Sequence, residues 1–472
     1  MQTLWQDLRY NVQMLVTKEA YMLLRKLSML AALLSLLCFC PRASLVAQEP
    51  LDGYWEGVIA EQGKELRFNV EFKRQAGGLA ATINIPDLYI LGYQLTKVSY
   101  ESPNVHFELA LGSEPERFDG TFQGGNISGK YAGRFYKQEP RSAAFHLWRQ
   151  KRKASGYTPE EVSFQNGAVK LAGTLFVPSK KGPHPAVVFF HGSGPQTRES
   201  YLRFFAALFA ERGVATLIFD KRGTGASTGE IWYRTGDRFD NLVADAISGV
   251  QFLRSRPDIA PKKIGLWGLS QGGWLAPMTA ARAKDIAFLM VVSGGGVIPA
   301  EQEVYDDEIK LRDKGFPPEQ VAEAVALLRL ADDVIRGREN WEKFSAVRAL
   351  AQKQEWFALL DRYPVKLPKE DGIWRAGSTE MDFDPRPLWE STTIPVLAIF
   401  GEADKSTPTR ESARRIETAL RKANNKDFTI RIFPNADHAL WISPKTGDAG
   451  GWDRPAPGWL DLTINWLQKH VK

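Results

Sequence analysis

The chain has 472 residues, of which 44% are hydrophobic and 25% are charged, a composition typical of a globular protein. Its formal net charge of +6 is small for this length, and no stripe of lysine and arginine runs along it, which excludes the electrostatic footprint of a nucleic-acid-binding protein. The length allows two to four domains of about 150 residues each, or one large α/β domain with additions.

The first segment is basic and then strongly apolar. An apolar run over 27–40 follows Arg25 and Lys26, and small residues lead from Pro41 to Ala47. The run is shorter than the stretch of about 20 residues that spans a membrane comfortably. This order of regions is typical of a secretory signal peptide that is cut after Ala47. An uncleaved N-terminal anchor is the alternative.

We therefore predict a leader over 1–47 and an exported protein, periplasmic or secreted, that keeps no stable membrane span. The leader has five basic and two acidic residues, so half of the net charge lies in it. Both cysteines, Cys38 and Cys40, also lie in it, so the mature chain would have no disulfide, no cysteine nucleophile and no cysteine ligand for a metal. The stretch from Met22 is a complete leader by itself, so Met1 and Met22 are alternative starts.

Residues 50–150 are predicted to form a small antiparallel β domain. Segments in which apolar and polar residues alternate are 66–72, 105–109 and 118–122. Turn candidates near such segments are Gly77-Gly78, Gly124-Gly125-Asn126 and Ser128-Gly129. Alternation with a period of two indicates strands that have one face in water. We predict a β-barrel or sandwich, followed by a polar linker over 150–156.

Beyond the linker, apolar strands alternate with helices. The predicted strands are 169–177, 186–190, 214–219, 264–267, 288–292, 396–400 and 428–433. The predicted helices are 201–212, 239–255, one that begins near Trp274, one through Ile416, and 460–470. Strands that are apolar throughout and alternate with helices indicate a mostly parallel sheet with helices on both faces.

This α/β region is predicted to have a first half over 155–295 and a second half over 391–472. A helical insertion over 296–390 separates them, with amphipathic character over 301–362. The insertion includes the aromatic residues Trp341, Trp356 and Phe357. We expect most of these rings to pack helix on helix rather than to line an acyl pocket.

One short stretch combines a strand, a tight turn and a helix around a serine. Residues 263–274 read KIGLWGLSQGGW, in which Gly268 to Gly272 fit the pattern G-x-S-x-G around Ser270. Glycines on both sides of the serine allow a strained turn that pushes the hydroxyl outward, as in a nucleophile elbow. The N–H groups at the start of the next helix favour negative charge at this point. A passive serine in a glycine-rich turn is the alternative.

Further motifs occur in a fixed order along the chain. They are His191-Gly192-Ser193-Gly194, the stretch DKRGTGAS over 220–227, the elbow at Ser270, Gly401-Glu402-Ala403-Asp404, and Asp437-His438. With these motifs the chain resembles the α/β-hydrolase superfamily over 160–295 and 392–472. The resemblance implies the α/β-hydrolase fold, in which the insertion is a cap, and the chain order serine, acid, histidine for a catalytic triad.

The residues of that triad follow from this order. Two histidines follow Ser270: His438 lies in a loop just after a strand, and His470 lies at the end of the last helix. We predict His438 as the general base, because a loop after a strand reaches the edge of the sheet. The resemblance places the acid at Asp404, with Glu402 as the alternative, where it would accept the Nδ1–H of the imidazole.

The resemblance also implies an oxyanion hole made of two backbone N–H groups. One is the N–H of Gln271, next after the serine. The other comes from the loop after strand 186–190, where we choose Ser193, with Gly192 and Gly194 as alternatives. His191 in the same loop is expected to shape the loop rather than act as a base.

The stretch 220–227 is predicted to be a structural turn beside the pocket, with Arg222 paired to a nearby carboxylate. The chain has no HExxH, CxxC, Walker A or dinucleotide fingerprint, so the predicted chemistry requires no cofactor and no metal.

The leading β domain, the motifs and the size of the cap resemble a bacterial carboxylesterase-like family of serine hydrolases. The resemblance implies that carboxylic esters of short to medium acyl chain are cleaved through an acyl-enzyme. A peptidase of the prolyl-oligopeptidase type is an alternative, although the β domain is too short for the propeller of those enzymes. An acyl thioesterase is another, and an inactive scaffold that binds a partner through the β domain is the non-enzyme alternative. The predicted partner is a small-molecule ester rather than a nucleic acid, and no pattern defines an oligomeric state.

Overall fold

The computed structural model describes residue 22 and residues 51–112, 114–135, 141–199, 201–231, 238–360, 364–370, 379–444 and 451–472. The predicted leader lies outside these residues except for Met22. The chain divides into two compact units, 1–51 and 52–472. Within the described ranges, no helix has the length and apolar character that crossing a membrane requires.

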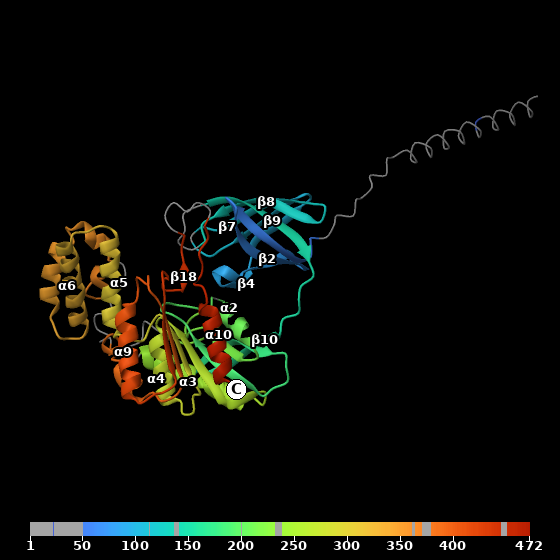
Figure 1. Ribbon diagram of the computed structural model, residues 1–472. Coiled ribbons are helices and arrows are strands. Elements are labelled where there is room, and N and C mark those ends of the chain that lie inside the picture. The colour runs from blue at the N-terminus through green and yellow to red at the C-terminus, as the bar shows by residue number, and fades with distance from the viewer. Residues whose placement is uncertain are drawn as a thin grey trace, which may run out of the picture. The chain divides into compact units, whose positions relative to one another are not determined.

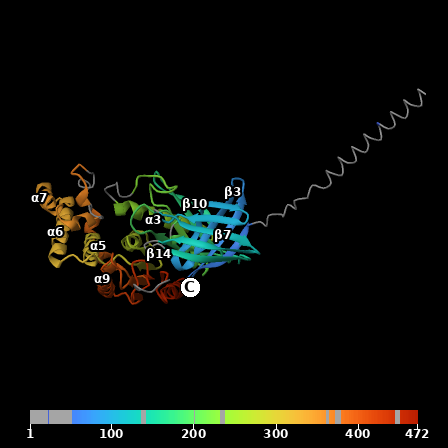
Figure 2. The ribbon, with the colours of Figure 1, turned by 90° about the horizontal axis from the view of Figure 1, so that it is seen from above.

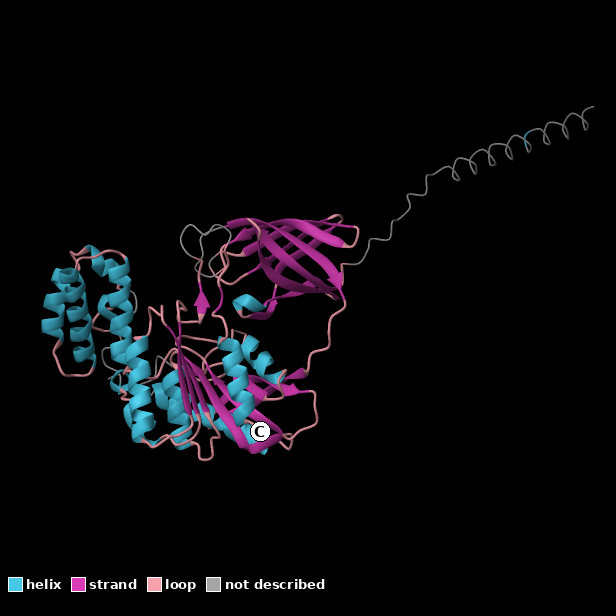
Figure 3. Cartoon of the chain, in the orientation of Figure 1, coloured by secondary structure: helices cyan, strands magenta, loops and turns pink. Residues whose placement is uncertain are grey.

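Residues 53–150 build one antiparallel sheet of nine strands (Figures 1 and 3). In sheet order the strands are β4 (Ile90–Gln94), β3 (Gly78–Ile85), β2 (Lys64–Gln75), β1 (Gly53–Glu61), β9 (Arg141–Gln150), β8 (Asn126–Gly133), β7 (Glu116–Gln123), β6 (Asn104–Leu109) and β5 (Thr96–Glu101). A short 3₁₀ helix, η1 (Pro86–Leu88), connects β3 to β4. The sheet is nearly closed, because β3 and β5 approach each other near its two ends.

Alternation along the strands fills the inside of this sheet with apolar side chains. In β2, Leu66, Phe68 and Val70 are buried, and the residues between them lie nearer to solvent. The rings of Phe107 and Phe118 stack at 4.6 Å between centroids in the same interior. The predicted small antiparallel β domain is therefore confirmed.

One turn predicted in this domain is wrong. Ser128-Gly129 lies inside β8, where Gly129 is opposite Gly120 of β7. A Cβ atom on Gly129 would lie 2.0 Å from the carbonyl oxygen of Asp119. The glycine thus marks a close approach of two backbones rather than a change of chain direction.

The second part of the unit is built on a sheet of eight strands. Their order is β10 (Tyr157–Asn166), β11 (Val169–Pro178), β13 (Ala215–Phe219), β12 (His184–Phe190), β14 (Ile259–Leu269), β15 (Leu289–Val292), β16 (Val396–Gly401) and β17 (Phe428–Phe433). From β13 to β17 the strands are parallel, while β10 and β11 form an antiparallel edge. Strand β10 was not predicted, because an edge strand with several exposed polar residues lacks the apolar run of a buried strand.

Helices cover both faces of this sheet (Figures 1 and 2). On one face lie α2 (Leu202–Ala210) and α10 (Trp459–His470); on the other lie α3 (Arg238–Ser255), α4 (Gly272–Arg282), α8 (Arg386–Ser391) and α9 (Thr409–Lys422). Strand β12 shows the reason. Val188 and Phe190 pack with the α3–α4 side, and Val187 and Phe189 pack with the α2–α10 side. Each fully buried side chain of this kind contributes about 1.5–3 kcal/mol, so both faces must be covered.

The predicted helical insertion forms a cap with its own apolar core. Its helices are α5 (Pro299–Asp313), α6 (Pro318–Ile335) and α7 (Trp341–Ala351), followed by the 3₁₀ helices η3 (Glu355–Leu359), η4 (Pro364–Lys366) and η6 (Thr379–Asp382). Figure 2 shows α5, α6 and α7 side by side. Trp356 is buried in the cap core, and Trp341 and Phe357 pack against it. These three rings therefore pack within the cap, as expected.

Candidate active site

The predicted order of strand, turn and helix around Ser270 is present in the structure. Ser270 follows β14 directly, and α4 begins two residues later. Its φ of 54° lies in the left-handed region, which residues with a side chain rarely adopt. A Cβ on Gly268 would lie only 2.1 Å from the carbonyl oxygen of Gly272. The glycines therefore permit strand and helix to meet at a turn that a larger residue would block.

Asp404 and His438 meet at the carboxyl ends of β16 and β17. Asp404 Oδ2 lies 2.8 Å from His438 Nδ1. The carboxylate is fully buried, and its Oδ1 accepts hydrogen bonds from the N–H groups of Ser406 and Thr407 at 2.8 and 2.9 Å. A carboxylate in this position holds the proton of the imidazole on Nδ1, which leaves Nε2 as the basic nitrogen.

The two other acids near this loop have different partners. Glu402 is at the surface and forms an ion pair with Arg410 at 2.7 Å. Asp437 Oδ1 accepts two backbone N–H groups of its own turn, and burial raises the pKa of its carboxyl group. The structure thus places Asp404, and not Glu402, against His438. His470 lies at the end of α10, where its Nδ1 is 2.7 Å from the carbonyl oxygen of Trp466.

The serine and the histidine are connected through a segment that the sequence did not single out. Thr407 Oγ1 donates to the carbonyl oxygen of Ser293 at 3.0 Å and lies 3.5 Å from His438 Nδ1. Gly294, which follows Ser293 in the chain, packs closely on the elbow. A Cβ atom on Gly294 would lie 2.2 Å from the carbonyl oxygen of Ser270. Within the described part of the chain, no hydrogen bond joins Ser270 Oγ to His438. Such bonds are often long in active sites without substrate.

The loop after β12 reaches the nucleophile. A Cβ on Gly192 would lie 3.6 Å from Ser270 Cβ. The N–H of Gly192 donates to the hydroxyl of Tyr201 at 3.2 Å, so this group is already engaged. In the residues that the structure describes, the N–H groups of Ser193 and Gln271 have no acceptor. These are the two groups chosen from the sequence for an oxyanion hole.

His191 is buried at the start of the same loop. Its Nε2 lies 2.7 Å from the carbonyl oxygen of Phe219 and donates to it. Burial, aided by the nearby charge of Lys221, lowers the pKa of His191 to about 3. The imidazole is therefore neutral and fixed to the end of β13, which fits the loop-shaping role expected from the sequence.

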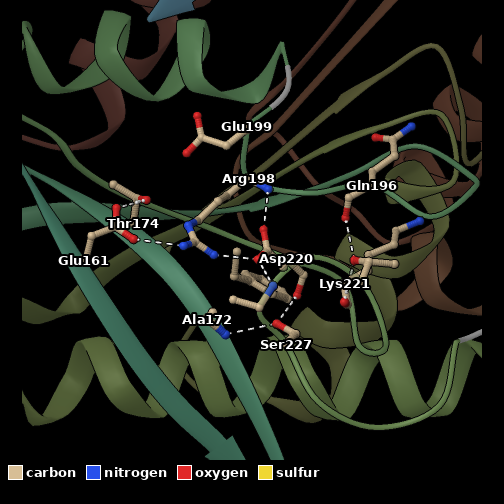
Figure 4. Close-up of polar contacts among 12 residues, drawn as sticks. Glu161, Ala172, Thr174, Gln196, Arg198, Glu199, Asp220, Lys221 and Ser227 are labelled. Atoms are coloured by element: carbon tan, nitrogen blue, oxygen red, sulfur yellow. Dashed lines mark hydrogen bonds and ion pairs between the residues drawn. The ribbon is translucent and has the colours of Figure 1, made fainter. Parts of the chain in front are cut away.

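The 220–227 stretch is a turn held by buried ionic bonds (Figure 4). Asp220 accepts hydrogen bonds from the backbone N–H and the guanidinium of Arg198 at 2.7 and 2.5 Å, and from the N–H of Ala226 at 2.8 Å. Arg222 forms a bidentate ion pair with Asp245, in which Nε lies 2.8 Å from Oδ2 and Nη2 lies 2.6 Å from Oδ1. The predicted pairing of Arg222 with a carboxylate is confirmed.

The cap is bonded to the loop that carries Asp404. Ser406 Oγ donates to Asp306 Oδ1 of α5 at 2.7 Å, and Lys405 pairs with Asp313 at 2.6 Å. The pKa of Tyr305, also on α5, is raised by burial and then by the negative charge of Asp404. A cavity of about 410 Å³ lies between α5, α6 and the turn at Pro408. Across the described ranges, no cluster of His, Cys, Asp or Glu is arranged to hold a metal.

A sequence model of the alpha/beta hydrolase family matches residues 187–446, more than half of the chain. The chain belongs to the alpha/beta hydrolase family. This alpha/beta hydrolase is 23% identical over 355 residues to Esterase EstD of Thermotoga maritima, a match that covers 71% of this chain and 74% of that protein. It is 32% identical over 136 residues to Thiohydrolase aneE of Aspergillus aculeatus, a match that covers 29% of this chain and 41% of that protein.

Solved structures to which the chain is similar include the esterase Pf2001 of Pyrococcus furiosus, with a TM-score of 0.42 and 18% identity over 67% of this chain and 92% of that one. Acetyl xylan esterase 1 of Thermoanaerobacterium sp. has a TM-score of 0.42 and 17% identity over 68% of this chain and 86% of that one. The chain spans less than half of the length of Thiohydrolase aneE and about three quarters of Esterase EstD.

Proposed function

We propose that this alpha/beta hydrolase is an exported serine esterase that cleaves carboxylic esters of short to medium acyl chain. Ser270 would be the nucleophile, His438 the general base and Asp404 the acid. The proposal is carried by the 2.8 Å contact between a fully buried Asp404 carboxylate and His438 Nδ1, together with the left-handed turn of the elbow at Ser270. The match to Esterase EstD along most of both chains supports it.

The chemistry follows from the roles of these groups. His438 Nε2 takes the hydroxyl proton of Ser270 as its Oγ attacks the ester carbonyl, and the resulting oxyanion accepts hydrogen bonds from the N–H groups of Ser193 and Gln271. The imidazolium then gives the proton to the leaving alcohol as the C–O bond breaks, which leaves an acyl-enzyme. Water attacks the acyl group by the same steps and releases the acid and free Ser270.

A thioester is the second candidate substrate. A thiohydrolase is among the relatives that are more than 30% identical over their matched segment. The same serine would form the same acyl-enzyme, with a thiol instead of an alcohol as the leaving group.

The test begins with a fluorophosphonate probe, which reacts with an activated serine. We expect wild-type protein to be labelled and Ser270→Ala to be unlabelled and slower by about 10⁶-fold in kcat, because the triad acts as a unit. Rates with p-nitrophenyl esters, acyl thioesters and peptide p-nitroanilides then separate the substrate classes. Ester turnover that persists in Ser270→Ala would refute the assignment, and turnover of anilides alone would favour the peptidase.

A further inference from the structure

Lys221 is a buried cation that the proposed chemistry does not use. It follows β13 and Asp220 in the 220–227 turn (Figure 4), and only 3% of the residue is exposed. Its Nζ donates to the carbonyl oxygens of Gly192 and Gly194 at 2.5 and 3.0 Å, and to Gln271 Oε1 at 2.9 Å. An ammonium group has three N–H donors, and each of them has an acceptor here.

The bond to Gly192 fixes the direction of the Ser193 N–H. The carbonyl of Gly192 and the N–H of Ser193 belong to one planar trans peptide, so they point in opposite directions. Because the carbonyl oxygen points at Lys221, the N–H points away from it. Two other positions in the loop offer no free donor, because the Gly192 N–H is bound to Tyr201 and Pro195 has no N–H.

The bond to Gln271 reaches the second half of the proposed oxyanion hole. Gln271 is the residue after the nucleophile, and its side chain is bound to Lys221 while its backbone N–H has no acceptor among the described residues. One side chain therefore ties together the two loops that carry the proposed donors, Ser193 and Gln271, which are 78 residues apart in the chain. Donors that are fixed before the reaction stabilise an oxyanion more than donors that must first be oriented.

Burial makes this cation costly. Desolvation lowers the pKa of the Lys221 ammonium to about 7. A methionine would fill the same space without that cost, whereas the lysine gains hydrogen bonds to Gly192, Gly194 and Gln271.

We propose that Lys221 is a positioning residue, which holds the N–H groups of Ser193 and Gln271 in the geometry of the oxyanion hole. This inference rests on the proposed function. It acts on the transition state, where the oxyanion exists, and not on the uncharged ester in the ground state.

The test compares wild type with Lys221→Met, using p-nitrophenyl butyrate as the substrate. We expect kcat to fall by about 10- to 100-fold. This fall is no larger than the fall in kcat that follows the removal of a whole oxyanion donor. KM should change by no more than about threefold, because the ground state makes no use of the hole. An alkyl trifluoromethyl ketone, whose adduct with Ser270 carries the oxyanion, should bind more weakly by a factor similar to the loss in kcat.

Thr224→Val is the matched control. Its hydroxyl lies 2.7 Å from the carbonyl oxygen of Lys221 in the same turn and 3.1 Å from that of Gln196 in the loop after β12, but it has no hydrogen bond to Gly192, Ser193 or Gln271. We expect kcat and inhibitor affinity close to those of wild type. An equal loss in this control would show that only the integrity of the turn matters and would overturn the inference.

Other outcomes are equally decisive. Unchanged kcat and unchanged ketone affinity in Lys221→Met would overturn the inference while the esterase proposal stands. If Lys221→Met does not fold, Gln271→Met takes its place, because it removes one of the three acceptors of Lys221 and keeps the backbone N–H of residue 271. A several-fold fall in the kcat of this variant would support the inference, and a wild-type kcat would overturn it. A wild-type protein without ester turnover and without probe labelling would end both proposals.

Discussion

Replacement of the Asp404 carboxylate by an amide tests the triad with the smallest change of shape. In Asp404→Asn the amide oxygen can still accept the N–H groups of Ser406 and Thr407, which Asp404 Oδ1 accepts at 2.8 and 2.9 Å. The amide NH₂ then replaces Oδ2, 2.8 Å from His438 Nδ1. Two donors cannot share a hydrogen bond, so the imidazole proton moves to Nε2, and Nε2 can no longer accept the proton of the nucleophile.

The magnitude follows from two losses that act together. The histidine is in the wrong tautomer, and the imidazolium that forms in the transition state no longer has a buried carboxylate beside it. An exchange of this kind lowers kcat by about 10⁴-fold, which corresponds to about 5.4 kcal/mol of transition-state stabilisation. The fold should change little, because both backbone hydrogen bonds of the turn remain.

The assay is kcat/KM with p-nitrophenyl butyrate, together with thermal unfolding of each variant. Glu402→Gln is the matched control, because it makes the same chemical change two residues away, in a surface ion pair with Arg410 that is worth at most about 1 kcal/mol. We expect its rate to stay within about twofold of wild type. An Asp404→Asn enzyme that keeps more than a tenth of the wild-type rate, or a large loss in Glu402→Gln, would refute the assignment of the acid.

Three further predictions concern pH, the β domain and export. The folded-state pKa of Lys221 lies below its ordinary value, at about 7, so between pH 7 and about 10.5 the unfolded chain binds a proton that the folded chain has lost. Urea unfolding should show wild type gaining stability relative to Lys221→Met as pH rises through this window, by on the order of 5 kcal/mol. A difference that does not change with pH would contradict the burial of this group. Tyr89 of the β domain stacks on Trp441, three residues after His438, with 5.0 Å between ring centroids, and its hydroxyl accepts the indole N–H of Trp459 at 3.0 Å. Tyr89→Ala should lower the free energy of unfolding by about 3–5 kcal/mol and also lower kcat, whereas Tyr89→Phe, which keeps the ring, should change both much less. An equal effect of the two variants would refute the argument from packing. If the proposed leader is cut after Ala47, N-terminal sequencing of protein recovered from the periplasm or medium should begin at Gln48, and an intact leader on that protein would contradict it.

Local patterns in the sequence predicted most of the elements and the residues of the proposed triad. Apolar runs such as 186–190 and 396–400 identify buried strands, because both of their faces must be covered, and the glycines around Ser270 identify a turn that only a small residue permits. Two errors have the same origin. The polar edge strand β10 has no apolar run, and Gly129 lies in a strand because another backbone passes close to it, a fact that no local pattern carries.

The sequence by itself determined two things: that a serine, an acid and a histidine follow one another in the order that a triad of this fold requires, and that strands alternate with helices. The resemblance had already favoured Asp404 over Glu402 as the acid. Tertiary structure shows that Asp404 lies 2.8 Å from His438, and it alone joined Thr407 to Ser293 across 114 residues and brought Lys221 to the loop at Gly192. The physical reason is that periodicity reports the environment of each element separately. Which loops meet at the carboxyl edge of the sheet depends on the strand order, and that order is fixed by packing between segments far apart in the chain.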